Sequence, residues 1–264
     1  MHSLAVFGIT GRMGQSLLLA LRETQALRLS GAIASRQSNR LGQDAAEQGA
    51  ATGVTITADV TQGLKGAAVA ADFSTGDCVA AHAGACAAAG IPLLIGATGF
   101  DLASREAVER AARLIPVLIT ANTSVGVSVV RQLVSLAAAK LGPAFDAEIF
   151  EAHHRMKRDA PSGTALALGE AVAQARAVSL REVASYDRAG LGEPRKPGSI
   201  GFSSLRGGDI VGVHTVIFAA AGESVEITHR ATDRVTFARG ALRAAEWLLG
   251  QPAGLYGMEH VLGL

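Results

Sequence analysis

Residues 151–165 hold several side chains that can move protons or bind anions. The stretch reads Glu-Ala-His-His-Arg-Met-Lys-Arg-Asp-Ala-Pro-Ser-Gly-Thr-Ala, so His153 and His154 are adjacent and Lys157 follows His153 by four positions. An imidazole exchanges protons near neutral pH, and an ammonium group is a compact positive charge. Lysine is rare in this chain, with four residues against twenty arginines, so its place beside two histidines indicates chemistry. The alternative is a solvated basic turn.

A predicted helix start directly follows these side chains. Ser162 is a good N-cap before an apolar run that begins at Ala165, which puts Gly163 and Thr164 in the first turn. The backbone N–H groups of a first turn lack intrahelical partners and favour anions, and small side chains let an anion approach. The pattern therefore predicts a site for a small carboxylate substrate next to an imidazole that can transfer a proton.

Near the N-terminus, three glycines have the spacing of a nucleotide-binding turn. Gly8, Gly11 and Gly14 follow a short apolar run at residues 4–7 and precede a predicted helix. Such a turn brings the backbone close to a pyrophosphate at the helix N-terminus. Glycine turns also serve packing alone, but the strand before and the helix after are the context that the nucleotide motif requires. We expect a dinucleotide cofactor at Gly8, Ile9, Thr10, Gly11, Arg12 and Met13.

Two later loops also follow predicted strands. In open parallel sheets, ligands bind outside the carboxyl ends of the strands. We therefore expect both loops near the nicotinamide, although ordinary connecting loops would have the same sequence character. The loops consist of Gly96, Ala97, Thr98 and of Thr120, Ala121, Asn122, Thr123.

The choice between NADH and NADPH depends on the end of the second predicted strand. Folds selective for NAD place Asp or Glu about 20 residues beyond the glycine turn, where it binds the ribose 2′-hydroxyl. Here that position is Ala34, followed by Ser35 and Arg36. A 2′-phosphate would find a hydroxyl and a guanidinium there, so we expect NADPH to be used at least as well as NADH.

The elements that position these residues alternate through the first part of the chain. Short apolar runs separated by helical stretches predict a Rossmann-type doubly wound parallel sheet. After about residue 123, a long helix and several strands joined mostly without helices predict a second α+β domain with a mostly antiparallel sheet. The expected strands of the second domain are residues 147–152, 200–205, 210–220 and 224–230.

Composition excludes several classes of protein. A net charge of +1 gives no electrostatic basis for binding nucleic acid or an anionic membrane, and no segment is expected to span a bilayer. Cys78 and Cys86 are eight residues apart in an Ala-rich stretch, too far for a disulfide, so two buried thiols in a reducing cytoplasm are expected. A metal site is not expected, and His214 and His229, in strand-like runs, are interpreted as structural.

The run at residues 151–165 resembles the motif of the 4-hydroxy-tetrahydrodipicolinate reductase (dihydrodipicolinate reductase) family. The resemblance extends over nearly the whole chain, through Gly8–Gly14, Gly96–Phe100, Ala121–Gly126 and Gly208–Gly212. It implies an NAD(P)H-dependent enzyme of lysine and diaminopimelate biosynthesis, which reduces (2S,4S)-4-hydroxy-2,3,4,5-tetrahydrodipicolinate to tetrahydrodipicolinate with loss of water. The sequence departs from the usual family pattern at Ala97, Thr123 and Val213.

The resemblance also implies roles and an assembly. His153 would donate the proton, Lys157 would stabilise charge as a second donor, and His154, Gly163 and Thr164 would hold the carboxylates. Residues 1–123 would bind the dinucleotide, residues 124–233 would bind substrate and form a homotetramer, and residues 234–264 would return to the first domain. Closure between the domains would use hinges near residues 122–125 and 231–234.

Two other functions fit the same scaffold. One is a different oxidoreductase, such as an amino-acid dehydrogenase, but the His-His-x-x-Lys and Ser-Gly-Thr combination argues against it. The other is a non-catalytic nucleotide-binding regulator, which would need neither His153 nor Lys157.

Overall fold

The computed structural model describes all of the 264 residues except 187, 189 and 191. The chain divides into two compact units, residues 1–125 with 235–264, and residues 126–234. The sequence predicts these divisions after residues 123 and 233. Each unit has its own sheet and its own core.

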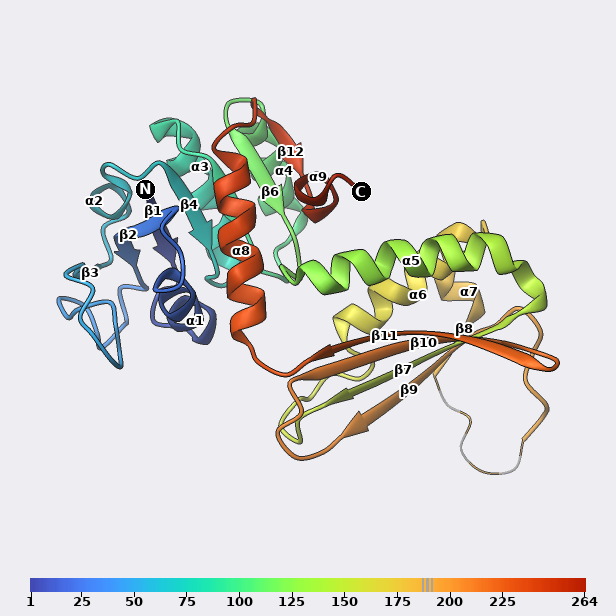
Figure 1. Cartoon of the computed structure of the whole chain (residues 1–264). Helices are drawn as coiled ribbons and strands as arrows, with labels where there is room; N and C mark the ends of the chain where they lie inside the picture. Colours follow the sequence, from blue (N-terminus) through green and yellow to red (C-terminus); the bar gives the residue numbers. More distant parts are fainter. Residues whose placement is uncertain (187, 189, 191) are drawn as a thin grey trace. The chain divides into compact units, whose positions relative to one another are not determined.

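The first unit is built on a seven-stranded parallel sheet, as expected (Figure 1). Strand β1 lies between β2 and β4, so the order of the strands reverses there. In sheets of this type, ligands bind at the point of reversal. In spatial order the strands are β12 (Gly254–Tyr256), β6 (Pro116–Ile119), β5 (Leu93–Ile95), β4 (Val69–Asp72), β1 (His2–Phe7), β2 (Leu27–Ile33) and β3 (Ile56–Thr57).

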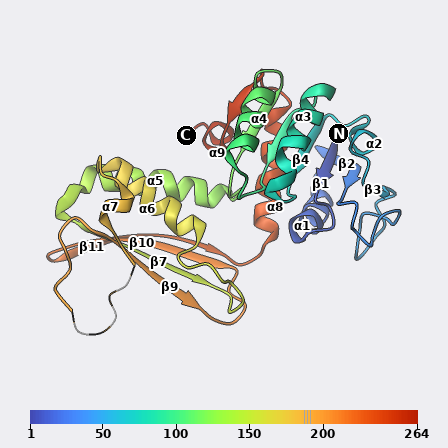
Figure 2. The same ribbon diagram turned by 180° about the vertical axis from the view of Figure 1, so that it is seen from behind.

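Helices bury both faces of this sheet. Because side chains of a strand alternate, Leu4 and Val6 enter the core with α1 and α8, whereas Ala5 and Phe7 enter the core with α3 and α4. Figure 1 is seen from the side of α8, and Figure 2 shows α3 and α4 in front. The helices of the unit are α1 (Arg12–Leu21), α2 (Val60–Leu64), η1 (Gly76–Cys78), α3 (Val79–Ala89), α4 (Leu102–Ala112), α8 (Val235–Leu248) and α9 (Met258–Leu262).

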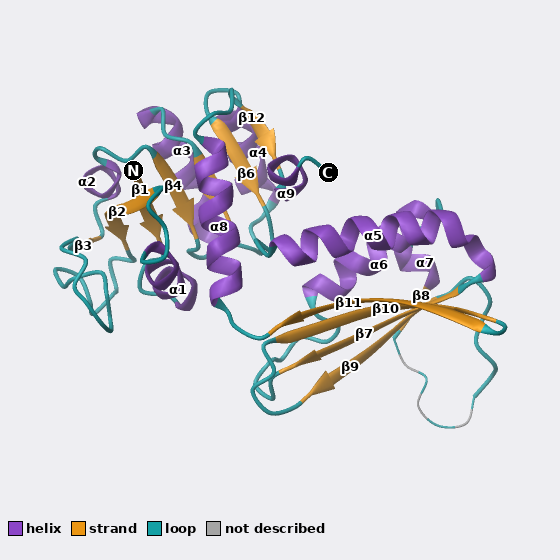
Figure 3. Ribbon diagram, in the orientation of Figure 1, coloured by secondary structure: helices purple, strands orange, loops and turns teal. Residues whose placement is uncertain are grey.

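The second unit has a five-stranded sheet that is mixed (Figure 3). The pairs β11–β10 and β10–β7 are antiparallel, but β7–β9 and β9–β8 are parallel. Most of the paired residues are in the antiparallel pairs, as expected, and the parallel pair β7–β9 arises because α6 lies between these strands in the chain and lets β9 return in the direction of β7. The strands are β7 (Asp146–His153), β8 (Ala184–Ser185), β9 (Ile200–Arg206), β10 (Gly212–Ala220) and β11 (Glu223–Ala231).

Helices cover one face of this sheet. Val130, Val134 and Ala138 of α5 pack in one core with α6 and with Ile149, Val216 and Phe218 of the sheet. The helices are α5 (Val125–Leu141), η2 (Gly142–Ala144), α6 (Gly163–Ala175) and α7 (Leu180–Val183).

One helix resembles a membrane span by length and composition. Residues 125–144 form a stretch that could cross a membrane by length and composition, with a mean hydropathy of 1.3. The stretch contains Arg131 and Lys140, and the buried residues of α5 pack in the core described above. It is one amphipathic helix that covers a sheet.

The cysteines differ from expectation in one respect. Cys86 is buried on α3, but Cys78 lies in η1 and is half-buried, so only one of the two thiols is buried. Both are free.

Candidate active site

The end of β7 carries a buried acid–histidine pair. Residues two apart on a strand point to the same side, and Nδ1 of His153 lies 2.6 Å from Oε2 of Glu151. The Glu151 side chain is 1% exposed and that of His153 is 12% exposed. Arg206, opposite His153 on β9, donates to both oxygens of Glu151, at 2.8 and 2.6 Å. The pair is therefore held by two neighbouring strands.

The surroundings of Glu151 keep its carboxylate ionised. Burial raises its pKa, but hydrogen bonds from Arg206, Ser204 and His153 outweigh burial and lower the pKa to about 2. An ionised carboxylate only accepts hydrogen bonds, so Nδ1 of His153 carries a proton. Proton exchange with a substrate is then left to Nε2.

Opposing effects act on the pKa of His153. Burial lowers its pKa below the ordinary value, Glu151 opposes this effect, and the positive charges of Lys157 and Arg206 add to it. Its Nε2 faces the backbone of Gly212, where a side-chain Cβ would lie 3.2 Å from that nitrogen. The ring also meets that of His214 edge to face, with centroids 5.1 Å apart.

The start of α6 is fixed to the same pair. The hydroxyl of Ser162 accepts from the N–H of Ala165 at 3.2 Å, which confirms the predicted N-cap. The Ser162 N–H donates to Oε1 of Glu151 at 3.2 Å, and its hydroxyl lies 2.9 Å from Nε2 of His214. Gly163 is exposed and Thr164 half-buried in the first turn, so an anion can approach the N–H groups there.

His214 has the structural place expected of it. It is buried, and burial lowers its pKa to about 4. A neutral imidazole at this position bonds the N-cap without adding a charge beside His153.

Lys157 and His154 lie in the turn between β7 and α6. The N–H of Lys157 donates to the carbonyl oxygen of His154 at 3.1 Å. The Lys157 ammonium group forms an ion pair with Asp159 at 2.8 Å, and the Asp159 side chain is 60% exposed. A substrate carboxylate can replace this exposed partner. The structure thus brings His153, Lys157 and the start of α6 into one part of the second unit, with His154 in the connecting turn.

The sequence interpretation gave no role to Glu151 or Arg206. The two-residue spacing of Glu151 and His153 on a predicted strand was a usable signal for the first. Arg206 lies 55 residues beyond Glu151, and only the parallel pairing of β7 with β9 brings it near, so no local pattern pointed to it.

The glycine turn of the first unit has the geometry that a pyrophosphate requires. Gly8 has φ +74°, a conformation that favours glycine. Gly14 packs so tightly that a Cβ would lie 2.6 Å from the carbonyl oxygen of Gly8. Gly11 caps α1 and Arg12 is exposed at its first position. The turn offers helix N–H groups without a covering side chain, and the site fits a dinucleotide.

Some residues expected near the cofactor have buried side chains. Ile9, Ala34, Ala97 and Thr123 are at most 8% exposed, and the Thr123 hydroxyl donates to the carbonyl oxygen of Phe237 at 2.6 Å. Their side chains belong to the core, so any contact with a cofactor is through their backbone. Thr98 and Ala121 are exposed, and Gly96, Thr120 and Asn122 are half-buried.

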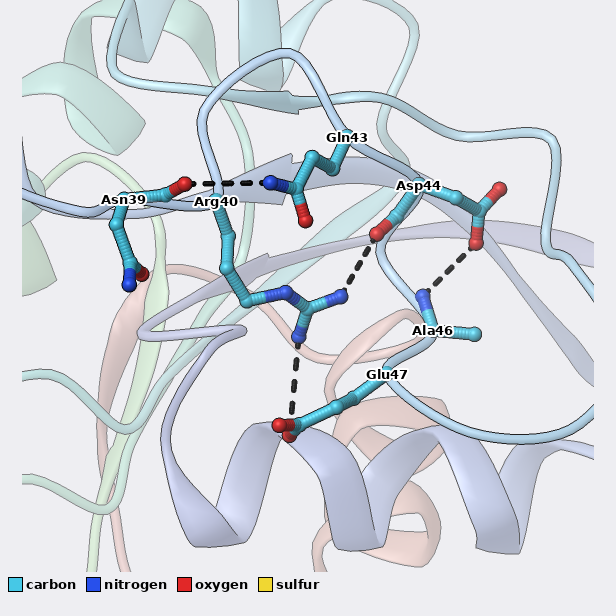
Figure 4. Close-up of a pocket in the computed structure, with 6 residues that line it drawn as sticks. All are labelled: Asn39, Arg40, Gln43, Asp44, Ala46 and Glu47. Atoms are coloured by element: carbon cyan, nitrogen blue, oxygen red, sulfur yellow. Dashed lines mark hydrogen bonds and ion pairs between the residues drawn. The ribbon is translucent and has the colours of Figure 1, made fainter.

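The loop after β2 contains the residues expected at the ribose of the cofactor, and they differ in how accessible they are. Ser35 and Arg36 are exposed. Arg40 is held within the loop, because its Nη2 donates to the carbonyl oxygen of Asp44 at 2.9 Å and its Nη1 lies 3.9 Å from Glu47 (Figure 4). Asp44 accepts from the N–H groups of Ala46, Thr52 and Gly53. A cavity of about 540 Å³ in this loop is lined by Asn39, Arg40, Gln43, Asp44, Ala46 and Glu47.

A nucleotide-type sheet in one unit and a carboxylate-bound histidine beside a helix start in the other define a nicotinamide-dependent oxidoreductase. Comparison with known proteins agrees at the level of family. The models "Dihydrodipicolinate reductase, N-terminus" and "Dihydrodipicolinate reductase, C-terminus" match residues 2–123 and 126–262. The chain belongs to the dihydrodipicolinate reductase family.

Relatives match over their full length. A 4-hydroxy-tetrahydrodipicolinate reductase from Thiobacillus denitrificans is 49% identical over 98% of both chains. Another, from Anaeromyxobacter dehalogenans, is 48% identical over 100% of this chain and 98% of the relative. The fold is shared with a dipicolinate-bound dihydrodipicolinate reductase from Paenisporosarcina sp. TG-14, with a TM-score of 0.78 and 22% identity over 98% of this chain and 99% of that one.

Proposed function

We propose that this chain catalyses the reaction for which its family is named. It reduces (2S,4S)-4-hydroxy-2,3,4,5-tetrahydrodipicolinate to tetrahydrodipicolinate, with loss of water and oxidation of NAD(P)H, in lysine and diaminopimelate biosynthesis. The observation that carries the proposal is His153, bonded through Nδ1 to an ionised, buried Glu151 beside the start of α6. A non-catalytic nucleotide-binding regulator, the alternative function, would not require this arrangement.

The bound cofactor supplies a hydride, and the residues of this chain supply the proton. Hydride addition to the ring that remains after loss of water leaves negative charge, which a proton must neutralise. Nε2 of protonated His153 donates it, and Glu151 stabilises the imidazolium from the other side of the ring. Lys157 places positive charge near the same point and lowers the energy of the anionic intermediate.

The start of α6 binds the carboxylates. The N–H groups of Gly163 and Thr164 and the ring of His154 hold the dianion, while the N-cap keeps the first turn rigid through Glu151 and His214. Because the N-cap and His153 share Glu151, the bound ring is placed in a fixed position relative to the proton donor.

The first unit binds NADPH at least as well as NADH. Ser35 and Arg36 are exposed at the end of β2, and Arg12 is exposed in the glycine turn. Arg40 is held within the loop by its bond to the carbonyl oxygen of Asp44. A carboxylate to test the ribose position belongs at Ser35, since Ala34 is buried.

The second unit assembles the enzyme into a homotetramer that works in the cytoplasm. The sheet face opposite the helices carries the half-buried Phe150 and Ile217 and the 42% exposed Leu205 beside polar residues such as Glu148. A sheet face with apolar side chains among polar ones is a typical surface for association of subunits. Light scattering coupled to size exclusion tests the assembly, and Ile217→Glu should dissociate it.

A coupled assay tests the reaction. Substrate made enzymatically in place should cause oxidation of NADPH that depends on both substrate and chain. Loss of NADPH without substrate, or none with it, would overturn the proposed function.

A further inference from the structure

A buried carboxylate with no role assigned so far lies at the carboxyl end of β4. Asp72 is fully buried, and both of its oxygens are hydrogen bonded. Its Oδ2 lies 2.9 Å from Nδ1 of His82, and its Oδ1 accepts from the N–H of Ser74 at 2.9 Å and from the Ser74 hydroxyl at 2.5 Å. The ring of His82, on α3, stacks on Phe7 with centroids 4.0 Å apart. A satisfied network of this kind makes the local backbone rigid.

The turn held by Asp72, residues 73–76, touches the loops on both sides of it. A Cβ placed on Gly8 would lie 2.6 Å from the carbonyl oxygen of Phe73, and one placed on Gly96 would collide with the Phe73 ring. At the other end of the turn, a Cβ on Gly76 would lie 2.8 Å from the backbone nitrogen of Phe100. The glycine turn and the loop after β5 therefore rest on residues 73–76, with no space for one added methyl group.

We propose that Asp72 and His82 are a positioning pair for the cofactor. They fix the turn at residues 73–76, and this turn fixes Gly8 of the glycine turn and Gly96 of the neighbouring loop. The inference rests on the proposed cofactor role of those two loops. The pair acts through the backbone and does not need to contact the cofactor itself.

Two substitutions of His82 separate its ring from its hydrogen bond. His82→Phe keeps a ring against Phe7 and removes the donor to Asp72, whereas His82→Asn keeps a donor near the place of Nδ1 and removes the ring. Val108→Ala is the control, because Val108 on α4 is fully buried in the same core as Ala83 of α3. This control loses stability without a change at residues 73–76. Nicotinamide fluorescence gives Kd for NADPH and NADH, and thermal unfolding gives Tm.

His82→Phe should raise Kd for NADPH roughly tenfold, because it removes a hydrogen bond to a buried charge. Its kcat at saturating NADPH should stay near that of the wild type, and His82→Asn should recover most of the affinity. Val108→Ala should lower Tm and leave Kd unchanged. The proposal is overturned if His82→Phe binds NADPH as the wild type does, or if Val108→Ala weakens binding equally.

Two further measurements keep the test decisive. If His82→Phe does not fold, Ser74→Ala is used in its place, because it removes only the hydrogen bond from the Ser74 hydroxyl to Asp72. This variant should still weaken NADPH binding, and an unchanged Kd for NADPH overturns the proposal. A wild-type chain that binds neither NADPH nor NADH would instead refute the cofactor site, a failure visible before any variant is made.

Discussion

Replacing Glu151 by Gln tests how His153 becomes a proton donor. The variant keeps the shape of the side chain, removes its charge and adds an amide donor that must face either His153 or Arg206, which both donate. Loss of a negative charge 2.6 Å from Nδ1 removes about 3–4 kcal/mol from the stabilisation of the imidazolium. We therefore expect kcat to fall about 10²–10³-fold.

The assay follows NADPH oxidation over a range of pH. Protonated His153 is lost as pH rises through its pKa, and without Glu151 that pKa falls further, so the falling limb of kcat/KM should move to lower pH. Glu148→Gln is the matched control once size exclusion shows that it assembles as the wild type does, since Glu148 lies on the opposite face of β7 and also pairs with an arginine, Arg195, at 2.9 Å. If Glu151→Gln turns over as fast as this control, the carboxylate does not act through His153.

Three further predictions concern Lys157, the ribose site of the cofactor and the dependence of stability on pH. Lys157→Ala should cost about 3 kcal/mol of transition-state stabilisation with little change in Tm, because the ion pair that it loses is exposed; wild-type turnover would remove Lys157 from the chemistry. Ser35→Glu should lower kcat/KM for NADPH more than for NADH, and an equal loss would place the ribose elsewhere. The low pKa of Glu151, about 2 against 4.5, contributes roughly 3 kcal/mol of stability that is present above pH 4.5 and lost as pH falls toward 2. Because the pKa of His214 is about 4 against 6.5, stability is also lost as pH falls from 6.5 toward 4. The free energy of unfolding in urea, measured at several pH values, should lose the first of these pH dependences in Glu151→Gln and the second in His214→Asn. Variants whose unfolding free energy changes with pH as that of the wild type does would contradict the assignment.

Periodic patterns predicted most of the fold. The apolar runs of the first unit became β1, β2, β4, β5 and β6, because strands buried on both faces leave an unmistakable signal. The direction of β9 was not predictable, since it depends on a crossover through α6 and a long connection. Short elements such as β12 were missed because three residues carry too little pattern.

The site was predictable where it is local. His153, Lys157 and the Ser162 cap lie within ten residues, so one stretch of sequence holds them. Arg206 and His214 reach the site only through the pairing of their strands with β7, which the sequence does not display. The burial of Ala34 likewise depends on which face of the sheet its side chain enters at the end of β2.

Transfer of deuterium from NADPH to the product is the most direct test that this chain catalyses the proposed reduction. NADPH that carries deuterium at both C4 positions of the nicotinamide, given to the wild-type chain with enzymatically made substrate, should leave deuterium on a ring carbon of tetrahydrodipicolinate. An unlabelled product, formed while the labelled NADPH is consumed, would contradict the account.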